Sequence, residues 1–497
     1  MTRDYSEWVT SRRTLLGGTA GMIGLLAAGR LGRAVAQPPA VTDPEELKRI
    51  EAALPAKAPA IPRKPRRLLI FDLNVGYGGH GSITTANTAF ALMGQRTGAF
   101  ETIQSRDPAV FRPESLRQFD AVFFNNTVGN CFEDPALRQS LVEFVYSGGG
   151  LMGVHGTSVA FTKWPGAIED WPEFGIMLGA RGANHKTNDE HVFIKLDEPM
   201  HPVNQAFGGQ DFDYRDEFFR VHEPYSRDRV RVLMSIDTQK TDMQQQPSYG
   251  AVVRSDDDYA LAWVRQYGLG RVFYCGFAHH PSVFWDPKML EFYLAATQFA
   301  LGDLVAPTTP SARLTPAIRA QEQFGCRLAL VPSPATELSL FDMIDRAAQL
   351  GVLYIGASEH QKVSGEIPKN FDNGLTDDDM RQIRLKLDSA GVGLTTYRVT
   401  DTSSPRPDPN VLEFYRRSGV EFASCEKWTV GPDAVEASPI VGLNNAVRSD
   451  HLDGILQQVR GATSSNLLCT LEYTDEAAQG VEAFNKAVIR LTNGEKS

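Results

Sequence analysis

The chain has 497 residues, of which 42% are hydrophobic, 9% aromatic and 22% charged. This composition excludes collagen, coiled coil and wholesale disorder, and the length predicts two to four domains. Fifty Lys and Arg residues against 60 Asp and Glu residues give a net charge of −10. Because this charge repels a phosphate backbone and the folded part has no basic run, we expect no nucleic-acid partner.

The cysteines are odd in number and scattered, and none forms a CxxC pair. They are Cys131, Cys275, Cys326, Cys425 and Cys469. This pattern argues against a disulfide framework and against a structural zinc cluster. One disulfide stays open but is not predicted.

The N-terminal segment has the pattern of an export signal. Arg12 and Arg13 precede an uncharged run at 14–29, and Ala34-Val35-Ala36 supplies small residues at cleavage spacing. The paired arginines resemble a twin-arginine signal. A membrane anchor is the alternative, but the run is shorter than the roughly 18 residues of a spanning helix. We expect cleavage of residues 1–36 and a periplasmic, soluble protein without a membrane span.

Seven prolines follow the signal between residues 37 and 65. Proline favours extended backbone and interrupts helices, so this composition is typical of a linker. We predict a tether with at most one short helix, outside the core.

Residues 66–303 alternate strand-length apolar runs with amphipathic helical stretches. The runs at 68–74, 121–126, 151–156 and 271–278 are nearly continuous, and helical stretches cover 84–95, 134–149 and 286–303. Continuous apolar strands between helices predict an α/β fold with a doubly wound parallel sheet covered on both faces. Ligands bind such sheets at the carboxyl ends of the strands.

Imidazole and amide side chains follow four of these predicted strands. His80 lies in the Gly-rich loop GYGGHGSI, Asn125 and Asn126 end another strand, His155 lies in GVHG, and His279 lies in GFAHHP. Because the carboxyl ends of parallel strands share one edge of the sheet, we predict a functional site there.

Several segments resemble the ThuA-like (trehalose utilization) family. They occur in the family's order across residues 66–303 and include GGGLMGVHGTSVAF, WPEFGIMLGA, the segment around His185, His201-Pro202, DEFF at 216–219 and GRVFYCGFAHH. The resemblance implies a flavodoxin-like fold related to class I glutamine amidotransferases. Those enzymes carry a nucleophilic Cys where this chain has His155, so glutamine hydrolysis through a thioester is excluded. Cys131 follows a different strand, and we interpret it as a structural thiol.

The resemblance also implies a set of site residues: His80, Asn125, Asn126, His155, Trp171, His185, Asp216, Glu217 and His279. Among these we predict Glu217 as base, His155 as acid or carbonyl polariser and His279 as their partner or a metal ligand. The others are predicted to bind substrate, with the amides on sugar hydroxyls and Trp171 stacked on a pyranose, although Trp171 is equally suited to the core. Imidazoles with Glu217 also suit one divalent metal, and the spacing does not separate these alternatives. No nucleotide cofactor is expected.

Residues 313–497, after a linker at 304–312, repeat a helix–Gly–strand pattern that predicts βα units of a barrel. The segment 362–392 resembles sugar phosphate isomerase/epimerase proteins of the xylose-isomerase-like barrel class, which places Glu426 and Glu472 at strand ends. This half is shorter than the about 250 residues of a complete barrel, and only His451 lies between those two strands. We predict a contracted, partial TIM-barrel-like domain without an isomerase centre, which covers the first domain's site or mediates dimerisation.

The leading hypothesis is a periplasmic carbohydrate-processing enzyme that acts on trehalose-type disaccharides or their keto derivatives, as a hydrolase, lyase or isomerase. The first alternative is a non-catalytic sugar-binding or scaffolding protein. The second is an isomerase centred on Glu426 and Glu472. The expected partner is a small-molecule carbohydrate, and homo-oligomerisation stays open.

Overall fold

The computed structural model describes residues 41, 43–166, 168–244, 254–333, 337–399, 408–425, 429–430, 440–443, 452–462 and 467–494. These residues belong to one compact unit. The predicted export signal, Glu426 and His451 lie outside the described residues. Among the helices that are described, none has both the length and the apolar character to cross a bilayer.

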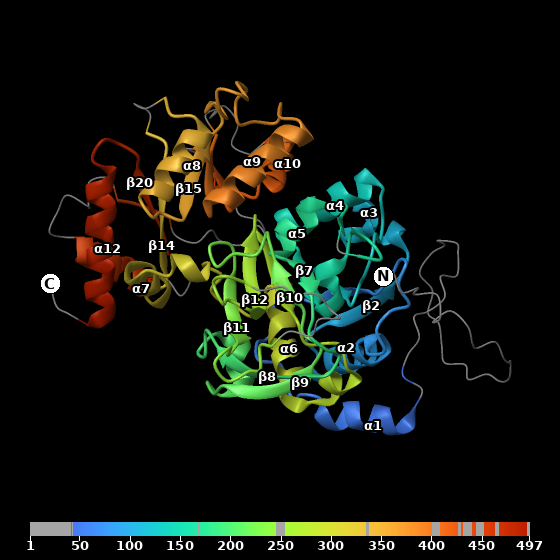
Figure 1. Cartoon of the computed structure of the whole chain (residues 1–497). Coiled ribbons are helices and arrows are strands. Elements are labelled where there is room, and N and C mark those ends of the chain that lie inside the picture. The colour runs from blue at the N-terminus through green and yellow to red at the C-terminus, as the bar shows by residue number, and fades with distance from the viewer. Residues whose placement is uncertain are drawn as a thin grey trace. The chain divides into compact units, whose positions relative to one another are not determined.

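The first half of the chain forms one large mixed sheet with helices on both faces. Its strands are β1 (Arg67–Phe71), β2 (Glu101–Ser105), β3 (Ala121–Asn125), β4 (Gly150–Val154), β8 (Glu190–Leu196), β9 (Phe212–Asp216), β11 (Arg231–Ile236), β12 (Ala260–Tyr267) and β13 (Gly270–Cys275). The order across the sheet is β2-β1-β3-β4-β13-β12-β11-β8-β9. Figure 1 labels β2, β8, β9, β11 and β12 of these strands. The first five strands in this order are parallel. The rest are antiparallel, so the predicted doubly wound sheet is confirmed and carries an antiparallel extension.

Successive residues of the parallel strands enter two different apolar layers. The helices of this half are α1 (Pro44–Ala53), α2 (Ile83–Thr97), α3 (Pro113–Leu116), α4 (Pro135–Tyr146), α5 (Pro172–Leu178) and α6 (Pro287–Leu301). Leu68 and Ile70 pack with residues of α2 and α6. Leu69 and Phe71 pack with residues of α4 and α5. This alternation explains the continuous apolar runs, because each strand is buried on both faces.

Polar residues mark where the helices begin and end. The Asp134 side chain accepts from the Ala136 backbone N–H at the start of α4, and Asp286 does the same for Lys288 at the start of α6. Each of these helices begins with proline, which is favoured at the first helical position. Gly98 and Gly302 end α2 and α6 in the left-handed conformation.

The short helix allowed for in the predicted linker is present as α1, but the prediction that residues 43–65 lie outside the core is wrong. Helix α1 buries Ile50 completely, and Ala53 and Leu54 join the same core as α2 and α6. Beyond the helix, the Ala60 backbone N–H and C=O both bond the side chain of Gln298. The prolines therefore bound a packed segment, and they do not extend a tether.

Two small pairs of strands lie outside the large sheet. The pair β5 (Thr162–Lys163) and β6 (Ile168–Glu169) forms an antiparallel hairpin. The pair β7 (Arg181–Asn184) and β10 (Arg220–His222) is also antiparallel.

The second half forms a sheet of parallel βα units. Its strands are β14 (Cys326–Val331), β15 (Tyr354–Ser358), β16 (Gly393–Arg398), β17 (Phe422–Ser424), β18 (Thr429–Val430), β19 (Ile440–Gly442) and β20 (Leu467–Glu472). Its helices are α7 (Pro316–Phe324), α8 (Leu340–Gln349), α9 (Asp377–Ala390), α10 (Pro409–Arg417), α11 (Leu452–Ala462) and α12 (Ala477–Asn493). The strand order is β18-β17-β16-β15-β14-β20-β19, so the first strand of this half lies beside the last (Figure 1). First-to-last pairing is the way a βα barrel closes, and the predicted partial barrel is confirmed.

Candidate functional site

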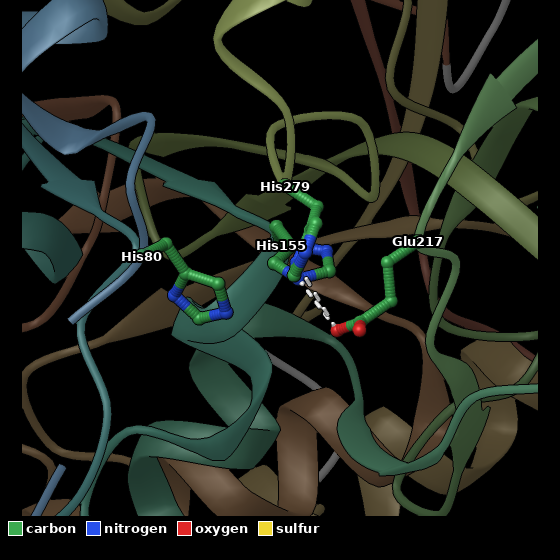
Figure 2. A group of neighbouring side chains, drawn as sticks. All are labelled: His80, His155, Glu217 and His279. Carbon is green, nitrogen blue, oxygen red and sulfur yellow. Dashed lines mark hydrogen bonds and ion pairs between the residues drawn. The ribbon is translucent and has the colours of Figure 1, made fainter. Parts of the chain in front are cut away.

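Four side chains from different loops of the first half converge on one point. His80 follows β1, His155 follows β4, Glu217 follows β9 and His279 follows β13. Each offers one nitrogen or oxygen atom, and these atoms all lie within 4.8 Å of one another (Figure 2). We call His80, His155, Glu217 and His279 the His/Glu group.

The turn after β4 holds His155 in a left-handed backbone conformation, with a φ of 42°. The glycine after it is also constrained. A Cβ at Gly156 would lie 3.0 Å from His80 Cε1, so the absence of a side chain there lets the two imidazoles approach each other. The ring centroids of His80 and His155 are 4.8 Å apart.

The two ring nitrogens of His155 have different partners. Nδ1 lies 3.1 Å from the carbonyl oxygen of Gly276, and Nε2 lies 3.1 Å from Glu217 Oε1. A carbonyl only accepts, so Nδ1 carries the hydrogen, and Nε2 of a neutral ring then faces the carboxylate with a lone pair. Two acceptors this close repel each other unless a proton or a metal ion lies between them. A backbone carbonyl on the far nitrogen is also the usual second contact of a metal-binding His.

Glu217 lies among three imidazoles and is almost fully buried. Besides the contact with His155, its Oε1 lies 3.4 Å from His279 Nδ1 and its Oε2 lies 3.4 Å from His185 Nδ1. Burial alone would raise the pKa of Glu217, but the hydrogen bonds that His155 and His279 donate when their facing nitrogens carry a proton hold it far below its usual range. The carboxylate is therefore negative at neutral pH, and its low basicity suits a ligand better than the predicted general base.

His80 completes the group as a neutral imidazole. Burial, reinforced by His155 and His279, lowers the pKa of His80 to about 2. Its Nδ1 is buried and has no hydrogen-bond partner among the described residues. A buried polar atom without a partner is costly.

The donor set fits a divalent transition metal. Three imidazoles and one carboxylate are ligands that Zn²⁺ and its neighbours accept, and bonds of about 2.1 Å place tetrahedral ligands roughly 3.4 Å apart. The contacts of Glu217 with His155 and His279, at 3.1 and 3.4 Å, are close to that spacing. The sequence left a metal open as one alternative, and the geometry supports a His/Glu group able to hold one.

Asp216 has a different role from the predicted substrate contact. Its carboxylate is fully buried and accepts from the backbone N–H groups of Ala278, His279 and His280, at 2.9, 3.2 and 2.9 Å. Burial raises the pKa of Asp216. The side chain therefore positions the loop that carries His279 and does not reach a ligand.

The two predicted amide contacts are also structural. Asn125 donates to the Ile83 carbonyl and to Asn87 Oδ1. Asn126 donates to Ser82 and to the Ala278 carbonyl, and its oxygen accepts from the Gly156 backbone. Both residues are fully buried and bond the loops around them, so these contacts do not support the predicted binding of sugar hydroxyls.

Trp171 belongs to the core and not to the site. It is 8% exposed and its ring packs against Phe132, Phe161 and Phe174. The predicted stacking of a pyranose on Trp171 is therefore wrong, and its alternative as a core residue holds.

His185 does lie at the site, beside Glu217 but outside the His/Glu group. Burial lowers the pKa of His185, and Glu217 opposes this shift. Sequence reasoning missed Tyr77, whose ring centroid lies 5.1 Å from that of His80. Its position in the same Gly-rich loop as His80 could have indicated that Tyr77 lies at the site. Phe219, 4.8 Å from the His155 ring, was also missed as a separate contact.

The family model described as ThuA, trehalose utilisation, matches residues 67–300. Solved structures that the chain resembles include two proteins described as ThuA-like. The one from Bacteroides uniformis has 16% identity and a TM-score of 0.39, over 48% of this chain and 93% of that one. The one from Parabacteroides merdae has 16% identity and a TM-score of 0.34, over 49% and 92%.

A third similar structure is a beta-galactosidase from Bacillus circulans, with 11% identity and a TM-score of 0.30 over 52% of this chain and 33% of that one. No curated protein matches the chain. The family match points to a carbohydrate-related role. Residues 67–300 of this chain are a ThuA domain, of the family described as trehalose utilisation.

Proposed function

We propose that the ThuA domain is a metal-dependent enzyme that processes disaccharides of the trehalose type or their keto derivatives. The observation that carries this proposal is the pairing of His155 with Glu217. The Gly276 carbonyl fixes a hydrogen on Nδ1, so the 3.1 Å contact of Nε2 with Oε1 needs either a second ring proton or a metal ion between the two atoms. The choice of a carbohydrate as the substrate class rests on the family match.

The residues of the His/Glu group and their neighbours have different proposed roles. A divalent cation held there would polarise a carbonyl or hydroxyl oxygen of a sugar. Glu217 supplies the fixed negative charge, while Gly276 and Asp216 orient His155 and the His279 loop. His185 contacts the second oxygen of Glu217 from outside the group, and we assign it the transfer of a proton to or from substrate.

An oxidised sugar suits this arrangement because the carbonyl acidifies the protons beside it. Withdrawal of such a proton by an imidazole allows elimination, hydration or isomerisation. A thiol route has no support, because burial raises the pKa of Cys131 to about 12 and its Sγ lies 3.5 Å from the Gly129 carbonyl. The thiolate that amidotransferase chemistry needs is thus absent at neutral pH.

We also propose that the protein acts after export, on the strength of the twin-arginine pattern at residues 12–36 alone. The expected outcome is a mature N-terminus near residue 37 in protein from the periplasmic fraction. Sequencing of that N-terminus tests the point, and an intact Met1 in that fraction would contradict cleavage.

A proton NMR time course of the mature protein with trehalose and its keto derivatives tests the enzyme proposal. We expect conversion that stops when a chelator is added and returns when a divalent metal is restored. His155→Ala should abolish turnover, whereas His191→Ala, an exposed His of β8, should retain it. Sugar binding without turnover under every metal condition would favour the non-catalytic alternative. Metal loss on mutation of Glu472, with the His/Glu group intact, would favour the isomerase alternative.

A further inference from the structure

An exposed indole lies beside the loop that carries His80. Trp164 is 36% exposed and follows β5, in the turn of the β5–β6 hairpin. The neighbouring Val75 is 38% exposed. Ile168, on the other strand of the hairpin, is 67% exposed. Exposed apolar side chains that lie together are informative where a single one is not, and such a surface can mark a ligand site.

Packing ties this indole to the site loop. A Cβ at Gly76 would lie 3.5 Å from Trp164 Cδ1, so the indole rests on the bare backbone of residue 76. The ring centroid of Trp164 is 5.4 Å from that of Tyr77, at an interplanar angle of 62°. The Tyr77 ring in turn lies 5.1 Å from the His80 ring. Three rings therefore run from the solvent to the His/Glu group.

We propose that Trp164 and Tyr77 bind one pyranose ring of the substrate and hold the adjoining part of the sugar over the His/Glu group. This inference rests on the proposed function for the identity of the ligand as a carbohydrate. An aromatic face matches the apolar C–H face of a pyranose, and the equatorial hydroxyls of the sugar then point sideways to polar groups.

Polar side chains occur in the same hairpin. Lys163 precedes Trp164 in the chain and is 68% exposed, and its ammonium lies 3.9 Å from the Asp170 carboxylate. A few exposed side chains are too small a surface for a stable protein partner, which needs about 800 Å² on each side. A sugar ring is therefore the occupant to which the proposal commits.

Calorimetric titration of the mature, metal-loaded protein with trehalose and with methyl glucoside tests this platform. We expect Trp164→Ala to weaken trehalose binding at least about tenfold and to raise KM more than it lowers kcat. Trp164→Phe, which keeps an aromatic face, should restore most of the affinity. Phe193→Ala is the matched control, because Phe193 is 37% exposed on β8 and should not affect the sugar.

The outcomes separate the platform from the enzyme proposal. Equal trehalose affinity in wild type and Trp164→Ala overturns the platform, even if turnover is normal. Weaker binding in Trp164→Ala with no turnover in wild type supports the platform and contradicts the enzyme. No binding of either sugar to the metal-loaded wild type overturns the platform as well. Metal content measured on each variant shows whether a lost affinity comes from a damaged His/Glu group.

Discussion

His155 combines a strained backbone with the central imidazole of the site. A non-glycine residue in the left-handed region costs about 1–2 kcal/mol, and such strain is retained where the surrounding structure needs it. Here the turn aims Nε2 at Glu217 while Nδ1 reaches the Gly276 carbonyl. The backbone conformation and the tautomer therefore both direct Nε2 of His155 toward Glu217.

This strain gives a test that separates fold from function. Replacing His155 by glycine or by alanine removes the same imidazole, but only glycine adopts a φ of 42° without strain. We expect His155→Gly to be more stable than His155→Ala by about 1 kcal/mol, measured by urea unfolding without metal. Both variants should lose metal binding. Equal stability, or a more stable alanine variant, would contradict the strained turn.

Asp216 gives a second prediction for a single residue. Asp216→Ala leaves three backbone N–H groups, one buried and two partly buried, without their acceptor, so we expect the free energy of unfolding to fall by about 3 kcal/mol. Metal affinity should fall as well, because the loop of His279 is released. Asp213→Ala on the same strand removes an exposed carboxylate and serves as the control. Unchanged metal affinity in a folded Asp216→Ala protein would show that Asp216 does not position the site.

Some of the site residues could be predicted from the sequence. Strand ends followed by His or Glu predicted His80, His155 and His279, and the family resemblance added Glu217 and His185. The roles of Asn126 and Asp216 could not be predicted, because their partners are backbone groups at Ala278 and Gly156, far away in the chain. A polar side chain near a site looks the same in sequence whether it binds substrate or supports a loop.

Among the elements, α1 gives the clearest departure from expectation. Its apolar residues recur at helical spacing, but the surrounding prolines suggested a tether. Ile50 is fully buried, so Ile50→Ala should lower the free energy of unfolding by about 2–5 kcal/mol. Glu51→Ala, an exposed neighbour on the same helix, should leave stability unchanged. Urea unfolding curves of the two variants measure this difference. Equal midpoints would show that α1 does not contribute to the core.

Helix α9 offers a pH-dependent prediction through its capping box. The Thr376 hydroxyl accepts from the Asp379 N–H, and the Asp379 carboxylate accepts from Lys369 and from the Thr376 N–H. The hydrogen bond to Lys369, with those to Thr376, lowers the pKa of Asp379 from 3.8 to about 2. A lowered carboxyl pKa contributes stability that is complete above the unfolded value and is lost as pH falls toward 2.

We therefore expect Asp379→Asn to be less stable than wild type at pH 7, with a difference that stays constant down to about pH 5 and shrinks in more acidic buffer. Thermal unfolding of wild type and Asp379→Asn at several pH values measures this difference. A stability difference between wild type and Asp379→Asn that grows as the pH falls would contradict this prediction.

Element prediction worked where periodicity was strong and failed where it was short. The buried strands β1, β3, β4 and β13 follow continuous apolar runs, and their helices follow caps and helical spacing. The hairpin β5–β6 has two residues in each strand, too few for any period to be visible. That hairpin carries Trp164, which is why the exposed indole was missed while the buried Trp171 was chosen.

On the scale of the whole molecule, the site belongs to the first half of the chain. The two halves are joined by buried ion pairs, in which Asp388 of α9 contacts Arg229 and Arg265, and Arg384 contacts Glu173. The His/Glu group and His185 all come from residues 66–303. No described residue of the second half belongs to this set. The expectation that the second half completes the site therefore has no support, and dimerisation stays a prediction.

The central claim is that His80, His155, Glu217 and His279 hold one divalent metal ion, and equilibrium dialysis followed by elemental analysis tests it most directly. Wild-type protein dialysed against Zn²⁺, Mn²⁺ or Co²⁺ should retain about one ion per chain, and bound metal should raise the unfolding temperature. Glu217→Gln and His155→Ala should retain far less than one, while His191→Ala should match wild type. A wild-type protein that retains no metal, or variants that retain as much as wild type, would contradict the account.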